Sequence, residues 1–146
     1  MSKKIGLVMG VFDMYHIGHL NLIRRAKENC DYLRVAVLSD ELVYSFKNKY
    51  PVIPLEERME ILASVRYVDE VVAITDTPSR ITEFERRPFD VFFSGDDYSD
   101  NEYWKWEKKE LNRLGADIVF FPYTKEQSST MIREKMTEKN DDKGND

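Results

Sequence analysis

The sequence contains little cysteine, histidine or glycine, and it has no long hydrophobic run. Its single cysteine, Cys30, excludes an intramolecular disulfide and is typical of a protein that works in a reducing cytoplasm. No segment approaches the 18 or more consecutive apolar residues of a membrane-spanning helix. The N-terminus leads directly into the apolar run 5–9, which is too short for the core of a signal peptide. We therefore expect a cytoplasmic protein without a membrane span.

The charge balance is acidic, with a formal net charge of −5 over 146 residues. Proteins that bind the nucleic-acid backbone need a basic face, so the excess of acid argues against nucleic acid as a partner. It does not exclude a nucleotide, because a few local lysines and arginines can neutralise one triphosphate. The length fits a single domain, which we place at residues 1–139. Residues 140–146 contain no apolar side chain, and we expect them to form a disordered tail.

Apolar runs and amphipathic segments alternate along the chain with short connections. We expect strands at 5–9, 32–39, 70–74, 91–94 and 118–121, and helices at about 18–29, 40–46, 55–65, 77–87, 101–114 and 131–139. This order predicts an α/β fold, namely a Rossmann-like, five-stranded, mostly parallel sheet with helices on both faces. Ligands of such folds bind beyond the carboxyl ends of the strands.

Both histidines of the chain, His16 and His19, lie between the first expected strand and the first expected helix. Backbone N–H groups and the positive end of the helix dipole converge where a strand feeds a helix through a glycine-containing turn, and this is a common site for a phosphate. Two imidazoles would add side-chain donors that neutralise charge on a polyphosphate. The residue types alone also allow two ordinary surface-loop histidines.

The segments 10–13 (G-V-F-D) and 16–19 (H-I-G-H) together resemble the HxGH signature of the nucleotidyltransferase superfamily, in the form G-[TV]-F-D-x-x-H-x-G-H used by small cytidylyltransferases. The resemblance implies that His16 and His19 are catalytic. It also implies nucleotide contacts from five further positions of this segment: Gly10, Val11, Phe12, Asp13 and Gly18.

A second segment, R-x7-R-Y-V-D-E-V at 58–71, resembles the corresponding segment of glycerol-3-phosphate cytidylyltransferases. The resemblance implies that Arg66 and Asp69 help to form a homodimer interface and lean toward the active site, with Arg66 taking part in catalysis. It places Arg58 near the phosphate of the acceptor. The residue types alone also allow a surface arginine on the helix and a buried salt bridge between Arg66 and Asp69, and both interpretations can hold together.

Lys47 and Lys49 lie in an expected basic loop after the second strand. Composition alone would make them a solvated surface pair. In small cytidylyltransferases lysines of this loop contact phosphates, so the resemblance implies that Lys47 grips the leaving pyrophosphate and that Lys49 contacts the substrate.

Two further segments complete the resemblance. Gly95-Asp96-Asp97-Tyr98 resembles the family's G-D-D-W, which implies a nucleotide contact for Asp96 and an acceptor contact for Asp97, although a turn or helix cap is the use that the residue types favour. Near the C-terminus, the segment 123–133 resembles the family's phosphate-binding segment, R-T-x-G-I-S-T-T or I-S-S-T-x-I-R. The resemblance implies that four hydroxyl side chains of this segment hold the β- and γ-phosphates: Thr124, Ser128, Ser129 and Thr130. The family's arginine is Tyr123 here and its G-I is Glu126-Gln127, so the choice between CTP and ATP stays open.

These segments together lead us to expect a cytidylyltransferase that transfers CMP from CTP to a small phosphomonoester, with glycerol 3-phosphate as the first candidate, and so supplies a CDP-linked precursor for a cell-surface polymer. The acceptor phosphate is already an anion, so the reaction needs positioning and charge neutralisation rather than a covalent residue. Mg²⁺ is expected to bridge the phosphates, without a ligand cluster from the protein. The alternatives are another acceptor (phosphocholine, phosphoethanolamine or a sugar phosphate), ATP in place of CTP, or a nucleotide-binding domain without turnover.

Overall fold

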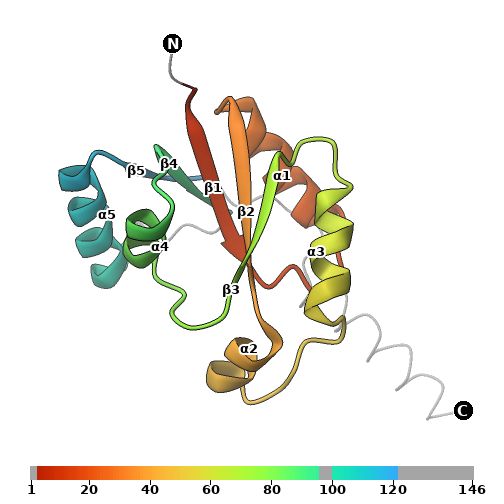
Figure 1. The fold of residues 1–146 in the computed structure, drawn as a ribbon. Helices are drawn as coiled ribbons and strands as arrows, with labels where there is room; N and C mark the ends of the chain where they lie inside the picture. The colour runs from red at the N-terminus through yellow and green to blue at the C-terminus, as the bar shows by residue number, and fades with distance from the viewer. Residues whose placement is uncertain (1–2, 96–99, 122–146) are drawn as a thin grey trace, which may run out of the picture.

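The fold is a single parallel β-sheet of five strands with helices on both faces, seen here in a computed structural model that describes residues 3–95 and 100–121 (Figure 1). The strands are β1 (Ile5–Gly10), β2 (Tyr32–Leu38), β3 (Glu70–Ile74), β4 (Val91–Ser94) and β5 (Asp117–Phe120). Their order across the sheet is β3-β2-β1-β4-β5, and every neighbouring pair is parallel. The predicted Rossmann-like α/β class is confirmed.

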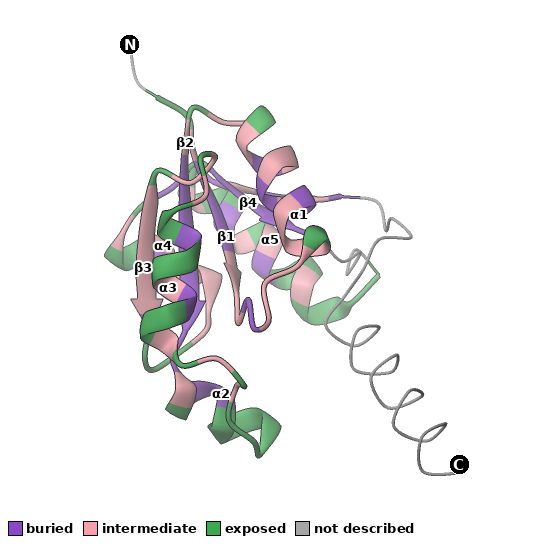
Figure 2. Cartoon of the chain, turned by 90° about the vertical axis from the view of Figure 1, so that its right-hand side faces the viewer, coloured by how far each residue is buried: buried purple, intermediate pink, exposed green. Residues whose placement is uncertain are grey.

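The helices pack in two layers, one on each face of the sheet. They are α1 (Ile17–Glu28), α2 (Asp40–Lys47), α3 (Leu55–Ala63), α4 (Arg80–Arg86) and α5 (Glu102–Leu114). Figure 1 shows α1 and α3 on one side of the sheet and α4 and α5 on the other. Helix α2 projects beyond the end of the sheet, and Figure 2 shows most of its surface exposed. Within the part of the chain that the structure describes, no helix is both long and apolar enough to cross a membrane.

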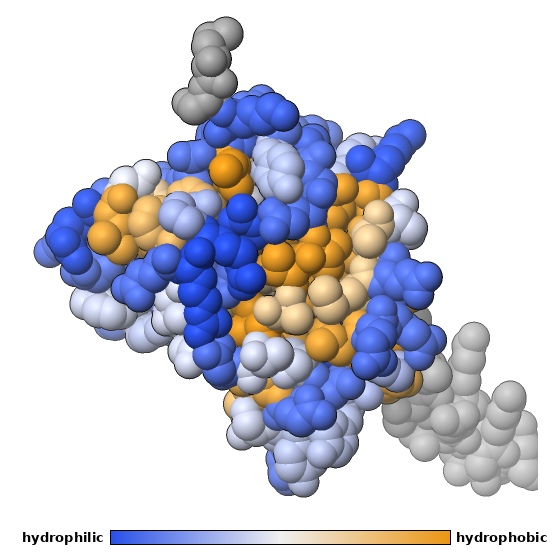
Figure 3. All heavy atoms as spheres, in the orientation of Figure 1, coloured by the Kyte–Doolittle hydropathy of each residue, from blue (hydrophilic) through white to orange (hydrophobic). Residues whose placement is uncertain are grey.

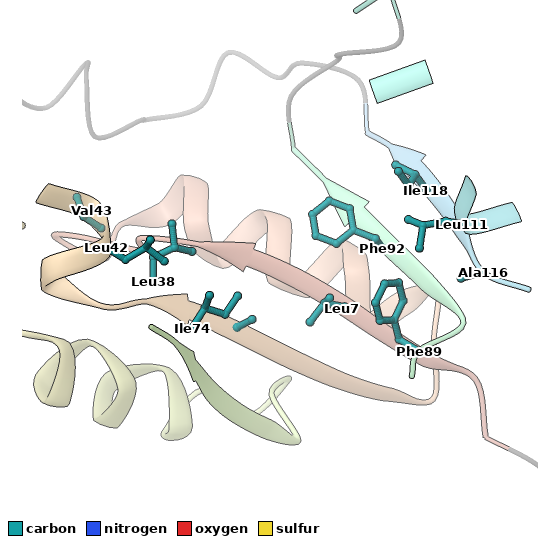
Figure 4. Packing of buried hydrophobic residues seen from close by; sticks show 11 residues of the cluster. Leu7, Leu38, Leu42, Val43, Ile74, Phe89, Phe92, Leu111, Ala116 and Ile118 are labelled. Atoms are coloured by element: carbon teal, nitrogen blue, oxygen red, sulfur yellow. The ribbon is translucent and has the colours of Figure 1, made fainter. Parts of the chain in front are cut away.

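The core divides into two clusters because successive side chains of a strand point to opposite faces. On β2, Val35 and Val37 pack toward α1 and α3, whereas Ala36 and Leu38 pack toward the other layer. Figure 4 shows this second cluster, which runs from Leu38 near α2 to Ile118 on β5. A strand that is buried on both faces is mostly apolar, as β2 is apart from Arg34, and β2 could therefore be recognised in the sequence.

Several element boundaries differ from the predicted ones for local reasons. Helix α2 includes Lys47 and ends at Asn48, which adopts a left-handed conformation with φ 58°, so Lys47 is a helical residue and not part of the expected loop. Helix α4 begins at Arg80 and not at 77, because the Ser79 hydroxyl accepts a hydrogen bond from the Thr82 N–H and caps the helix. The expected helix 131–139 and tail 140–146 lie outside the described residues.

Gly6 lies near the start of β1, where Phe93 of β4 and Cys30 after α1 leave no room for a side chain. A Cβ at this position would lie 2.7 Å from Cε2 of Phe93 and 2.8 Å from Sγ of Cys30. We expect Gly6→Ala to lower the free energy of unfolding by about 1–3 kcal/mol, the usual cost of overpacking a core. Urea denaturation would measure the change. Gly95→Ala is the matched control, because its Cβ would make only ordinary contacts of 3.5 Å or more with Leu22; equal stability of the two variants would contradict the prediction.

Candidate active site

The segment that carries both histidines leaves the sheet at the carboxyl end of β1, beside the point where the strand order reverses. Strand β1 is followed in the chain by its neighbour β2, whereas its other neighbour, β4, comes much later. In open α/β sheets this reversal opens a crevice in which ligands bind. The turn 11–16 therefore lies where the fold provides a binding site, as predicted.

His16 and His19 hold one another at the first turn of α1. His16 is the N-cap residue, and its Nδ1 accepts a hydrogen bond from the Gly18 N–H at 3.0 Å. Nδ1 of His19 accepts from the His16 N–H at 3.3 Å, and the two rings stack with their centroids 3.8 Å apart. An imidazole nitrogen that accepts a hydrogen bond carries no proton, so each neutral ring carries its proton on Nε2. The pair thus offers two N–H donors at the positive end of a helix dipole, which is an arrangement suited to phosphate oxygens.

Both imidazoles are held neutral at physiological pH. Burial and the neighbouring imidazole of His16 together lower the pKa of His19 to about 4, while the Asp13 carboxylate acts in the opposite direction. Burial also lowers the pKa of His16. A neutral imidazole can still donate its Nε2 proton, so neutralisation of a phosphate here would rest on oriented dipoles and not on an imidazolium charge.

The low pKa of His19 makes a testable contribution to the pH dependence of stability. The unfolded chain takes up a proton near pH 6.5, while folded His19 takes one up only near pH 4. The unfolded state therefore binds more protons between these values, and stability is lost as the pH falls from about 6.5 to about 4. Urea midpoints over this range should fall more steeply for the wild type than for His19→Gln. An NMR titration that placed the midpoint of His19 near 6.5 would contradict the assignment.

The turn before His16 is held in an unusual backbone conformation by contacts inside the chain. Phe12 and Met14 have positive φ angles of 54° and 51°, which non-glycine residues rarely adopt. Asp13 between them is buried, and its carboxylate accepts hydrogen bonds from the N–H groups of Val52 (2.7 Å) and Ile53 (2.9 Å). Asp13 thus anchors the turn to the loop before α3. The structure gives the Asp13 carboxylate a structural role, and the nucleotide contact predicted for it stays a prediction.

The remaining residues of the motif also support the turn. The ring edge of Phe12 packs against His19 with centroids 5.4 Å apart, and the carbonyl of Val11 accepts a hydrogen bond from Arg58. The N–H of Gly18 is already bonded to His16. Gly10 lies at the end of β1, where a Cβ would approach the Phe12 ring to 3.2 Å. The nucleotide contacts predicted for these four positions stay predictions.

Arg58 has a different position from the one expected of a residue that contacts the acceptor phosphate. It is 1% exposed. Its guanidinium donates to the carbonyls of Ile53, Val11 and Leu38 at 2.7–2.8 Å, and to Oδ1 of Asp40 at 2.6 Å. These bonds tie the ends of β1 and β2 to α3. We therefore assign Arg58 a structural role and leave it out of the substrate site proposed below.

The predicted salt bridge between Arg66 and Asp69 is wrong. Asp69 Oδ2 accepts hydrogen bonds from Nζ of Lys27 at 2.5 Å and from the Leu33 N–H at 2.8 Å, and these bonds lower the pKa of Asp69 against the effect of its burial. Arg66 is exposed, donates to the Tyr67 hydroxyl at 2.9 Å and lies over the Tyr67 ring. The lysine competes successfully because α1 brings it directly onto the carboxylate from an element 42 residues away.

Lys47 and Lys49 are exposed at the end of α2 and in the loop that follows it. The structure thus places them at the end of the sheet where the histidine turn also lies, without bringing them into a contact that defines a site. Six of the predicted site residues lie outside the described part of the chain: Asp96, Asp97, Thr124, Ser128, Ser129 and Thr130.

One feature that sequence reasoning missed is a cavity of about 550 Å³ at the carboxyl ends of β1 and β2. Gly10 is part of its wall, so the cavity adjoins the histidine turn. Its other walls come from α2 and from the connection between β3 and α4, and include Arg80. The Arg80 guanidinium is bound to the fully buried carboxylate of Glu107 and lies over the Trp104 ring. No local pattern marks such a cavity, because its walls are up to 71 residues apart in the sequence.

The fold is that of a nucleotidyltransferase. The chain belongs to the cytidylyltransferase-like family, whose model matches residues 7–135. It is 39% identical to an FAD synthase of Thermococcus kodakarensis over 126 residues, which are 83% of this chain and 82% of the relative. It is 35% identical to the glycerol-3-phosphate cytidylyltransferase of Bacillus subtilis over 135 residues, 92% of this chain and 97% of the relative. A lipopolysaccharide core biosynthesis protein of Thermoplasma volcanium shares the fold, with a TM-score of 0.70, 23% identity, and coverage of 84% of this chain and 99% of that one.

Proposed function

We propose that this enzyme transfers a nucleotidyl group from a nucleoside triphosphate, with CTP as the first candidate, to the phosphate of a phosphomonoester. The observation that carries the proposal is the pair of Nε2–H donors of His16 and His19 at the start of α1. An acceptor phosphate oxygen attacks the α-phosphorus, the bond from the α-phosphorus to the bridging oxygen breaks, and pyrophosphate leaves with the electron pair. The two donors stabilise the charge that grows on the phosphate oxygens in this step.

Two exposed lysines would add the positive charge that the neutral histidines do not supply. We assign Lys47 to the leaving pyrophosphate and Lys49 to the acceptor, because Lys47 ends α2 and Lys49 follows it at the carboxyl end of the sheet. Among residues 3–95 and 100–121 there is no group of three histidine, cysteine, aspartate or glutamate side chains that could hold a metal ion. Mg²⁺ would therefore arrive as the counter-ion of the triphosphate and belong to the substrate.

The acceptor first expected, glycerol 3-phosphate, is one candidate and is the substrate for which the Bacillus subtilis relative is named. A second candidate reaction is the adenylylation of flavin mononucleotide by ATP, which the 39% identity to an FAD synthase favours. The half-buried thiol of the single cysteine fits a cytoplasmic location for either reaction.

The test is pyrophosphate release in the presence of Mg²⁺, with CTP and ATP each crossed against glycerol 3-phosphate, phosphoethanolamine, phosphocholine, a sugar phosphate and flavin mononucleotide. We expect release with one nucleotide and one acceptor together and none when either is omitted. Nucleotide binding without release from any pair would refute transfer and identify a nucleotide-binding domain.

We also propose a homodimer that forms along β3. This strand lies at one edge of the sheet, and most of its side chains are only partly buried. Figure 3 shows an apolar surface in the middle of the face that carries β3, with hydrophilic residues around it. Arg66 and Tyr67 lie just before the strand. Light scattering should give twice the 17.3 kDa of one chain, and a mass of one chain would refute the dimer.

A further inference from the structure

The cavity beside the histidine turn has walls from three parts of the chain that meet at one end of the sheet. The wall residues are Met9, Gly10, Leu38, Leu42, Ser45, Phe46, Asp76, Thr77, Pro78 and Arg80. They come from the ends of β1 and β2, from one side of α2, and from the segment between β3 and α4. Figure 4 shows Leu38 and Leu42 close together at the junction of β2 and α2, with Ile74 beneath them.

The charged members of the wall are neutralised by partners within the chain, and apart from the hydroxyl residues Ser45 and Thr77 the rest of the wall is apolar. Asp76 receives two hydrogen bonds from the Arg86 guanidinium, which hold the pKa of this carboxyl at about 2. Arg80 is bound through two of its nitrogens to Glu107 and through the third to the carbonyl of Pro78. The unbalanced charge that a phosphate would need is thus missing from the described walls of this cavity.

The size of the cavity exceeds what a three-carbon phosphate ester requires. Its volume of about 550 Å³ lies within the range of about 300–1,000 Å³ that is usual for sites of drug-sized ligands. Phe46 is 52% exposed at its rim, so its ring is available for stacking. Met9 adds a thioether, which makes favourable contacts with aromatic rings.

The cavity is placed to hold the organic part of a molecule whose phosphate lies at the histidine turn. Gly10 belongs both to the cavity wall and to the strand end from which the turn starts. The crevice of the switch point lies between β1 and β4, whereas the cavity is walled by the ends of β1 and β2, by α2 and by the segment that follows β3. The cavity thus gives the acceptor a place of its own beside the turn and leaves the crevice to the nucleotide.

We infer that the acceptor of this enzyme is a phosphomonoester with a planar, aromatic, ring-sized organic part, which binds between Met9, Phe46 and Pro78. The inference rests on the proposed nucleotidyl transfer and specifies its acceptor. We therefore expect glycerol 3-phosphate and the phosphates of small amino alcohols to bind more weakly than a flavin-like phosphate. A small polar group would leave the apolar part of the wall in contact with water, and it would find no unpaired polar partner on Asp76 or Arg80.

The test compares acceptors and one bulky variant. Calorimetric titration of the full chain with flavin mononucleotide and with glycerol 3-phosphate should give at least a tenfold lower Kd for the flavin. Ser45→Trp would fill the cavity from α2, and we expect it to raise the Kd and KM for flavin mononucleotide at least tenfold while the KM for the nucleotide stays within twofold. Tyr44→Trp is the matched control, because Tyr44 lies on the same helix, is exposed and stacks on Tyr50 outside the cavity.

Each other result has a definite meaning. Equal or tighter binding of glycerol 3-phosphate, or flavin binding that Ser45→Trp leaves unchanged, would overturn the inference. A rise in the KM for the nucleotide instead would also overturn it and assign the cavity to the nucleobase. A third result is possible, in which Ser45→Trp abolishes flavin binding but no pair of substrates releases pyrophosphate. It would support the preference of the cavity for a ring and would refute the proposed transfer, so the failure of one proposal can be told from the failure of the other.

Discussion

We expect His16→Ala and His19→Ala each to lower kcat by about 10²–10³-fold, with a smaller change in the KM for the nucleotide. This is the usual cost of removing one preorganised donor from a site where negative charge develops. The structure supplies the reason for the preorganisation, because each ring is already oriented by a hydrogen bond at Nδ1 before any substrate arrives. Initial rates of pyrophosphate release at saturating substrate would measure the effect.

The control must separate the loss of the donor from the loss of the helix cap. The His16 side chain caps α1, so alanine at this position also costs about 1 kcal/mol of stability. Asparagine is a good N-cap residue but does not extend a donor to the position of Nε2. His16→Asn should therefore retain most of the stability and lose as much kcat as His16→Ala. A folded alanine variant with wild-type kcat would exclude the histidines from catalysis.

Arg58→Met should lower the free energy of unfolding by about 3–5 kcal/mol, the largest effect on stability that we expect of a single substitution in this chain. Removing one member of a buried ion pair leaves its partners without compensation. Here the variant would leave the carboxylate of Asp40 and the carbonyls of Val11 and Leu38 without their shared donor. Urea denaturation monitored by tryptophan fluorescence would give the change.

Arg113→Met is the matched control for this variant, since it removes the same guanidinium from an exposed position on α5. We expect it to change stability by no more than about 0.5 kcal/mol. If Arg58→Met instead unfolds at the same urea concentration as the wild type and fails only in acceptor binding, the structural assignment of Arg58 is wrong and the role first predicted for it is correct.

The strands could be predicted from the sequence because each depends on residues that are adjacent in the chain. A strand buried on both faces, such as β2, is a run of apolar and β-branched residues, and β3 and β4 were predicted with the bounds that they have. The motif with His16 and His19 was also local, since its residues are neighbours in the chain, but the contacts that anchor it through Asp13 come from residues 39 and 40 positions later. What the sequence left open was the choice of partner over long distances, as for Asp69, which binds Lys27 and not Arg66.

Arg58 shows the same limit for function. A buried arginine and a phosphate-binding arginine have the same side chain, and the difference between them lies in whether backbone carbonyls from other elements occupy the guanidinium. For Arg58 three such carbonyls do, and the most distant one belongs to a residue 47 positions away. The cavity beside Gly10 could not be predicted from the sequence for the same reason, because its walls come together only when the chain has folded.

The anchoring of Asp13 also has a consequence for the order in which the chain matures. Asp13 binds Val52 and Ile53, 39 and 40 residues later, and Arg58 binds back to Val11. Closing a loop of this length has an entropic cost that must be met before either contact forms. A nascent chain that ends before residue 52 therefore contains both histidines but not the supports that hold them in place. If the proposed function is correct, we expect affinity for a nucleotide only after the first two strands and α3 have assembled, so that the onset of nucleotide binding during synthesis would report the completion of this half of the sheet.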